Sequence, residues 1–273
     1  MMDIIQMDYN LLIGGISGIV SRTMVAPIEL YRIQKQNPFV PYSTMMDVYK
    51  KEGLRYFWKG NMTNCVRVFP QMAINYSAFR KTKKILEDKI ENKNILNFVS
   101  GCNAGLISIL LIYPLETTRT YLSLQTNNNK YRGITDVLRR LSIQELYQGS
   151  KMSILGFGSW SGLQYASYYY INNMVKDSIL DTKLISGGLS GMFAVSITYP
   201  SDLIRRRLQL QGFDKSVPKY DGIIDCVKKV YKYEGVKGFY RGLLANYVKT
   251  GPTLAIQFWT IEYLNKILNN KDI

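Results

Sequence analysis

The chain has 273 residues, of which 47% are apolar and 12% aromatic, and this content excludes a disordered chain. Its 35 Lys and Arg against 20 Asp and Glu give a net charge of +15, which attracts anions such as nucleic acid, lipid headgroups or phosphate ligands. Histidine is absent and the three cysteines form no CxxC, so we expect no His-based catalysis, no metal site and no cofactor.

Six long helices are predicted along the chain. The first ten residues, MMDIIQMDYN, resemble neither a signal peptide nor a transit peptide, so targeting information should lie in the rest of the chain. The helices run over roughly 9–35, 61–84, 95–122, 151–174, 182–210 and 244–267, with a short helix in the loop inside each successive pair. Segments 95–115 and 152–175 carry no charge and approach the ~20 residues that cross a membrane.

These helices belong to three copies of one unit, at residues 8–90, 91–178 and 179–273 of a single domain. Each copy has a pair of glycines four apart, then a proline nine residues later, an acid two residues after the proline and a base five residues after it. Each copy then has an aromatic residue two before a glycine. The prolines are Pro27, Pro114 and Pro200, and the later glycines are Gly60, Gly149 and Gly242.

The acid and the base after each proline are three residues apart, so they share one face of a helix. They are Glu29 with Arg32, Glu116 with Arg119, and Asp202 with Arg205. A pair within each helix is one interpretation of this spacing. A pseudo-threefold arrangement allows another, in which each acid meets the base of the next unit in a closed ring. Such a ring removes the ~2.5–3.5 kcal/mol that insertion scales assign to a charge stranded in hydrocarbon.

The three P-x-[DE]-x-x-[KR] motifs, with their aromatic-x-Gly partners, resemble the mitochondrial carrier family over essentially the whole chain. The resemblance implies an all-α protein of the inner mitochondrial membrane, with six transmembrane helices in three repeats, short matrix helices and alternating access to a central site. It implies proline kinks and a matrix gate pairing Glu29 with Arg119, Glu116 with Arg205, and Asp202 with Arg32. It also implies cardiolipin sites at Gly60, Gly149 and Gly242, where free N–H groups open a helix.

The opposite face departs from that family, whose even helices end in an aromatic, an acid and a base. Here the acid persists only at Glu262 and the base only at Lys83. We therefore expect a weak cytoplasmic gate and a state in which the matrix ring is closed. The loops inside the pairs carry more Lys and Arg than those between units, which predicts that both termini face the intermembrane space.

Repeat symmetry predicts the substrate site. Arg67, Gly156 and Lys249 each lie seven residues after the aromatic-motif glycine, and Arg22 lies five residues before Pro27. These positions place three cations, without a matching acid, near the middle of the membrane, so an anion should complete the cluster. Gly156 opens a slot beside two aromatic side chains, where a flat base can lie. They are Phe157 and Trp160.

Gly156-Phe157, Arg67 and Lys249 resemble the contact points of the nucleotide-transporting, ADP/ATP carrier-like branch of the family, and Arg205-Arg-Arg207 resembles the start of its arginine signature. Leu208-Gln209 and Pro252 differ from that branch. The prediction is a monomeric antiporter of nucleotides, adenine di- or triphosphates with ribose or deoxyribose. Alternatives are a carrier of coenzyme A, phosphate or a carboxylate. A soluble nucleic-acid-binding protein has only the +15 charge in its favour, and no catalytic motif indicates an enzyme.

Overall fold

The computed structural model describes residues 2–37, 45–125, 130–174, 182–213 and 217–269. Within these ranges the chain forms helices and no strand, as the sequence predicts. The first repeat contains α1 (Met2–Met24), α2 (Ala26–Gln36), α3 (Met45–Glu52), the 3₁₀ turn η1 (Leu54–Trp58), α4 (Asn61–Val66) and α5 (Val68–Leu86). The second contains α6 (Lys93–Leu124), α7 (Ile134–Arg140), α8 (Ile143–Leu146) and α9 (Ser150–Met174). The third contains α10 (Thr182–Leu210), α11 (Ile223–Gly238) and α12 (Leu243–Asn269).

The first repeat differs from the prediction in that both of its long helices are interrupted. The first begins at Met2 and breaks at Val25, just before Pro27, and the second breaks at Arg67. Proline has no N–H to donate to the carbonyl four residues earlier. The freed carbonyl of Thr23 instead accepts a hydrogen bond from the indole of Trp58, at 2.8 Å. The aromatic motif of the first unit therefore stabilises the kink of the same unit.

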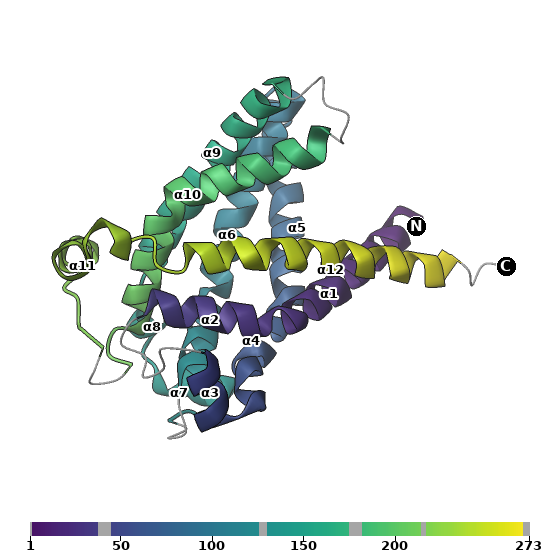
Figure 1. Cartoon of the computed structure of the whole chain (residues 1–273). Coiled ribbons are helices and arrows are strands. Elements are labelled where there is room, and N and C mark those ends of the chain that lie inside the picture. Colours follow the sequence, from purple (N-terminus) through teal and green to yellow (C-terminus); the bar gives the residue numbers. More distant parts are fainter. Residues whose placement is uncertain (1, 38–44, 126–129, 175–181, 214–216, 270–273) are drawn as a thin grey trace.

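The long helices surround a common axis (Figure 1). Neighbouring repeats meet where α1 packs against α12, α5 against α6 and α9 against α10. The short helices α3, α7, α8 and α11 gather at one end, and the start of α1 and the end of α12 lie at the other, where the long helices splay apart (Figure 1). This arrangement places the proline motifs close to the end that carries the short helices.

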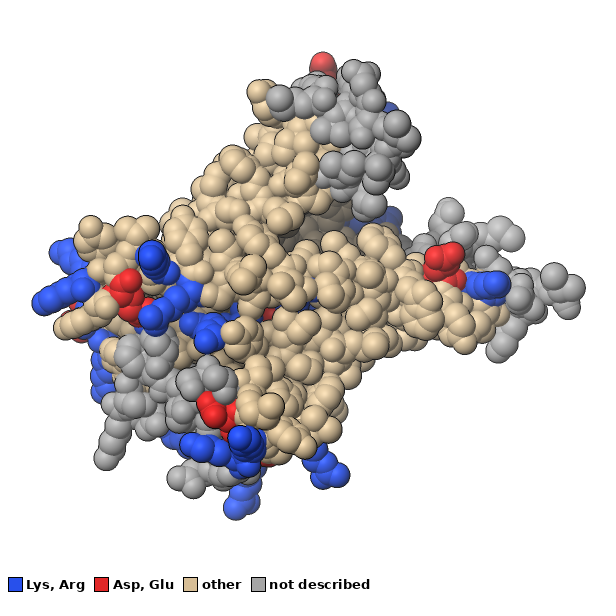
Figure 2. Space-filling view, in the orientation of Figure 1, with Lys and Arg blue, Asp and Glu red and all other residues tan. Residues whose placement is uncertain are grey.

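Residue burial along these helices is inverted relative to a soluble protein. Small polar side chains are fully buried between helices, whereas large apolar ones face outward. The buried set includes Ser17, Ser100, Ser186 and Ser190, and the exposed set includes Leu111, Phe193, Phe258 and Trp259. Figure 2 shows Lys and Arg gathered over the end where α3 and α11 lie, while the sides of α1, α10 and α12 in this view are mostly uncharged.

Among the described residues, one helix is long and apolar enough by itself to meet the criteria for a membrane span, and this helix is α6. Among the other long helices, α1, α10 and α12 carry charged side chains that line the interior, such as Arg22, Asp202 and Lys249. Charged side chains of this kind are tolerated in a membrane protein where they line a water-filled cavity.

Candidate functional site

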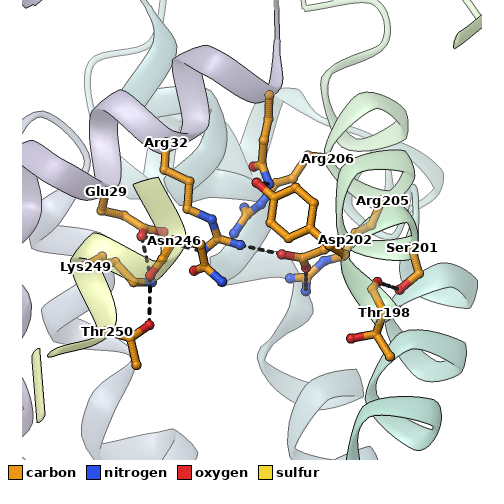
Figure 3. Close-up of polar contacts among 12 residues, drawn as sticks. Glu29, Arg32, Thr198, Ser201, Asp202, Arg205, Arg206, Asn246, Lys249 and Thr250 are labelled. Atoms are coloured by element: carbon orange, nitrogen blue, oxygen red, sulfur yellow. Dashed lines mark hydrogen bonds and ion pairs between the residues drawn. The ribbon is translucent and has the colours of Figure 1, made fainter. Parts of the chain in front are cut away.

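Three ion pairs between repeats close the end of the helix bundle that carries the short helices. Arg119 Nη2 lies 3.2 Å from Glu29 Oε1. The second pair joins Arg205 to Glu116, and the third joins Arg32 to Asp202, which Figure 3 shows. Each acid thus meets the base of another unit, in the order that the resemblance implies. Weaker contacts within the helices remain, at 3.6 Å between Arg32 and Glu29 and 3.7 Å between Arg205 and Asp202.

The aromatic-motif glycines hold this ring together through close backbone contact. Gly60, Gly149 and Gly242 all have φ between 80° and 87°, a left-handed conformation that favours glycine. A Cβ at these positions would lie 3.0, 2.8 and 3.3 Å from the carbonyl oxygens of three ring arginines, respectively Arg119, Arg205 and Arg32. The start of each even helix therefore packs directly on the ring-bearing segment of another repeat.

Two tyrosines reinforce these junctions. Tyr113 and Tyr199, the residues before Pro114 and Pro200, donate hydrogen bonds to the carbonyls of Gln148 and Arg241, at 2.8 and 3.0 Å. Those carbonyls belong to the residues just before the glycines. The first repeat has Ala26 at the tyrosine position and uses the Trp58 bond to Thr23 instead.

The three successive arginines of α10 point in three directions. Arg205 joins the ring, and Arg206 lies on the cavity floor, where it donates to Thr120 Oγ1 at 2.8 Å and lies 3.5 Å from Glu116. Arg207 donates to the carbonyl of Gln36 at 2.7 Å and pairs with Glu234 of α11 at 2.7 Å. The three arginines thus find partners in the ring, in the cavity and on α11.

A cavity of about 380 Å³ lies directly on the ring. Seven basic and three acidic side chains line it, which gives a formal charge of +4. The bases are Arg22, Arg32, Arg67, Arg119, Arg205, Arg206 and Lys249, and the acids are Glu29, Glu116 and Asp202. A buried excess of positive charge needs a counter-ion, and a polyphosphate or another multivalent anion can supply one.

The expectation that the cavity cations have no acidic partner is wrong for two of them. Lys249 Nζ lies 2.8 Å from Glu29 Oε2 (Figure 3), and Arg67 Nη1 lies 3.6 Å from Glu116 Oε1. Their long side chains reach from the even helices down to the ring, so two ring carboxylates are shared between ring bases and cavity bases. Arg22 differs, because its Nη1 is buried and has no hydrogen-bond partner among the described residues.

A second cavity, of about 200 Å³, opens beside Gly156. Its walls contain the predicted aromatic pair, Phe157 and Trp160, whose ring centroids lie 6.1 Å apart. Asp202 and Arg205 line this cavity as well as the cationic one, so the two spaces meet at the ring. The two cavities together offer an anion site next to an apolar and aromatic one.

No comparable network joins the described residues at the opposite end of the bundle. Among the residues that the structure describes, neither Lys83 nor Glu262 forms an ion pair. Part of the corresponding stretch of the second repeat, at Asn172, has a side chain outside the described residues. The closed ring agrees with the conformation expected from the sequence, and so does the opposite end, where the long helices splay apart in Figure 1.

Two site residues escaped the sequence analysis. The sequence did not show that Arg206 has a role different from those of Arg205 and Arg207, because consecutive residues on a helix differ only in the direction in which their side chains point. Asn246 lines the second cavity from α12. Its position three residues before Lys249, on the same helix face, is a signal that was available.

The sequence matches the family described as mitochondrial carrier protein three times, over residues 6–90, 91–179 and 181–272. The chain therefore belongs to the mitochondrial carrier family, whose members are transporters rather than enzymes.

Similar proteins include two whose names refer to adenine nucleotides and one whose name gives no substrate. The chain is 32% identical to the mitochondrial adenine nucleotide transporter ADNT1 of Arabidopsis thaliana, over 95% of this chain and 86% of that protein. It is 29% identical to the human mitochondrial adenyl nucleotide antiporter SLC25A24, over 95% of this chain and 58% of that protein. It is 28% identical to mitochondrial substrate carrier family protein P of Dictyostelium discoideum, over 95% and 94%.

Proposed function

We propose that this carrier is an antiporter that exchanges adenine nucleoside di- and triphosphates across the inner mitochondrial membrane. The observation that carries the proposal is the +4 cavity that adjoins the aromatic cavity beside Gly156. Phosphates fit the first and a flat base fits the second. The nucleotide names of the Arabidopsis and human relatives support the same substrate class.

The proposed topology has six membrane-spanning segments, formed by α1 with α2, α4 with α5, α6, α9, α10 and α12. Their outward apolar side chains and buried serines support this assignment. The basic residues around α3 and α11 favour the matrix for that end, which leaves both termini in the intermembrane space (Figure 2). One such bundle encloses both cavities, so a monomer is sufficient for transport.

Substrate binding loosens the ring in the proposed mechanism. Phosphate oxygens engage Arg22 first, because its buried nitrogen lacks a partner. They then compete with Glu29 for Lys249 and with Glu116 for Arg67. Each ring acid that loses a cavity cation is held less tightly. A substrate drives the change only if its contacts are tighter in the intermediate state, so the empty carrier does not cross and exchange is obligatory.

The proposed lipid contacts are cardiolipin phosphates at Gly60, Gly149 and Gly242. Each glycine directly precedes the start of a helix, and a helix N-terminus favours a bound anion because several of its first N–H groups have no partner within the helix. The same glycines are needed for close packing on the ring, so a glycine substitution alone does not test lipid binding. Loss of bound cardiolipin on native mass spectrometry, without loss of the folded monomer, is the measurement that separates the two roles.

A thermal-shift competition tests the substrate class. The purified carrier should be stabilised by ATP and ADP more than by coenzyme A, inorganic phosphate or malate, because bound ligand stabilises only the folded state. Arg67→Gln and Lys249→Gln should lose the ATP shift. The matched controls Lys84→Gln and Lys266→Gln, exposed cations on the same two helices, should keep it. Equal shifts with phosphate and ATP would favour another phosphorylated anion instead.

A further inference from the structure

The three ring carboxylates are not equivalent on their cavity side. Lys249 covers Glu29 and Arg67 covers Glu116, from the same position of the third and first even helices. The second even helix has Gly156 at that position, so no third cation covers Asp202. The exposed fractions of the acid side chains follow this difference, at 8% for Glu29, 15% for Glu116 and 31% for Asp202.

The uncovered carboxylate has hydrogen-bonding capacity to spare. Arg32 donates to its Oδ2, while Oδ1 lies 3.7 Å from Arg205, beyond a normal hydrogen bond. An ionised carboxylate has about four lone-pair sites and no donor. Asp202 thus presents an acceptor to any donor that enters the cavity beside Gly156.

The position of Asp202 between the two cavities defines which part of a nucleotide it can meet. Phosphates held in the cationic cavity leave the base to enter the second cavity, which has apolar walls that include Ile109, Met152 and Val195. An amino group on that base would reach Asp202, which is the one acidic residue among the described residues that line the second cavity. A carbonyl oxygen at the same place would set its lone pairs against the carboxylate.

We propose that Asp202 selects nucleobases that carry an exocyclic amino group, by accepting a hydrogen bond from it. The inference rests on the proposed function and specifies its substrate. Adenine and cytosine have this amino group, whereas hypoxanthine and uracil carry a carbonyl in its place. The site therefore distinguishes bases by one functional group, through a residue that also belongs to the gate.

Deaminated nucleotides test the proposal on the unaltered chain. ATP is compared with ITP, and CTP with UTP, by equilibrium binding, because each pair differs only in that the amino group becomes a carbonyl and the adjacent ring nitrogen gains a hydrogen. A hydrogen bond to a charged group corresponds to at least about a tenfold change in Kd. We expect ITP and UTP to bind about tenfold or more weakly than their partners.

Two variants locate the effect. Gly156→Lys supplies the missing third cation, which should cover Asp202 and reduce the ATP-to-ITP ratio of affinities to about twofold. An added Cβ at Gly156 lies 2.6 Å from the Ser201 hydroxyl, so Asp202→Asn is the second variant if the first does not fold. Its neutral amide can also donate to a carbonyl, so the ratio should fall similarly.

The outcomes separate this inference from the proposed function. Equal affinities for ATP and ITP, both tighter than for tripolyphosphate, overturn base selection by Asp202 and leave nucleotide transport intact. A tenfold ratio that persists in both variants also overturns the role of Asp202. Nucleotides that bind no better than tripolyphosphate overturn the proposed substrate, and the base selection with it.

Discussion

Neutralising Glu29 should weaken the closed state more than neutralising Asp202. Glu29 is nearly buried and lies within 2.8, 3.2 and 3.6 Å of nitrogens of Lys249, Arg119 and Arg32. Asp202 is more exposed and, among the described residues, forms ion pairs only with Arg32 and Arg205. The isosteric changes Glu29→Gln and Asp202→Asn therefore form a matched pair, since each removes one ring charge.

The magnitude follows from the number of cations left without a partner. At an effective dielectric of about 20, one pair at 3 Å gains roughly 5 kcal/mol before desolvation is subtracted. Removing one member of a buried pair costs about 3–5 kcal/mol net. We expect Glu29→Gln to reach this range and Asp202→Asn, which is better solvated and loses one contact fewer, to cost about half as much.

Thermal unfolding in detergent measures the difference. At about 2–4 °C per kcal/mol, Glu29→Gln should lower the Tm by roughly 6 °C or more. In Glu29→Gln the Lys249 ammonium loses its acidic partner, and adding Lys249→Gln removes that unpaired charge. The double variant should therefore regain part of the lost stability, with an interaction energy between the two substitutions of about 0.5–3 kcal/mol. Equal Tm losses for the two single variants, together with strictly additive effects in the double variant, would refute this account of the ring.

Three further predictions concern the short helices and their junctions. Glu234→Ala removes the carboxylate that pairs with Arg207, which is 2% exposed and keeps its bond to the Gln36 carbonyl, and should cost about 3–5 kcal/mol of stability; an unchanged Tm would show that the pair is dispensable. Gly149→Ala forces a side chain into φ 80° and against the Arg205 carbonyl, so a loss of at least about 1–2 kcal/mol is expected, and a neutral effect would contradict the close contact. Burial raises the pKa of the Cys226 thiol to about 12, so very little reactive thiolate is present at pH 7. In a variant with Cys226 as its sole cysteine, maleimide labelling should therefore require unfolding. Rapid labelling of the native protein would be inconsistent with this burial.

The repeats made much of the fold predictable from the sequence. Three proline motifs at a constant interval gave the helix pairs, and the three-residue spacing of acid and base placed both charges on one face. The first repeat was less predictable, since its breaks at Val25 and Arg67 lie shortly before Pro27 and Pro70, whereas the later prolines of the long helices lie inside continuous helices. The spacing of apolar residues along a helix does not show where that helix loses a single backbone hydrogen bond.

The members of the site and the three ring pairs were predictable, whereas the acidic partners of the cavity cations were not. Symmetry identified Arg67 and Lys249, but the reach of their side chains to acids on other helices depends on how the helices cross. The separate directions of Arg206 and Arg207 likewise follow from packing against Thr120 and Glu234. The sequence therefore predicted where charged side chains gather, and the structure adds which ring carboxylate pairs with each of the cavity cations Arg67 and Lys249.

Exchange in liposomes shows whether this carrier is a nucleotide antiporter that uses the cationic cavity. Carrier reconstituted into liposomes should take up labelled ATP rapidly when ADP or ATP is inside, and hardly at all when the lumen contains only buffer. Arg67→Gln and Lys249→Gln should abolish the exchange, while Lys84→Gln should not. Uptake of ATP that is equally fast into empty liposomes, or undiminished in both cavity variants, would contradict a nucleotide antiporter that uses this cavity.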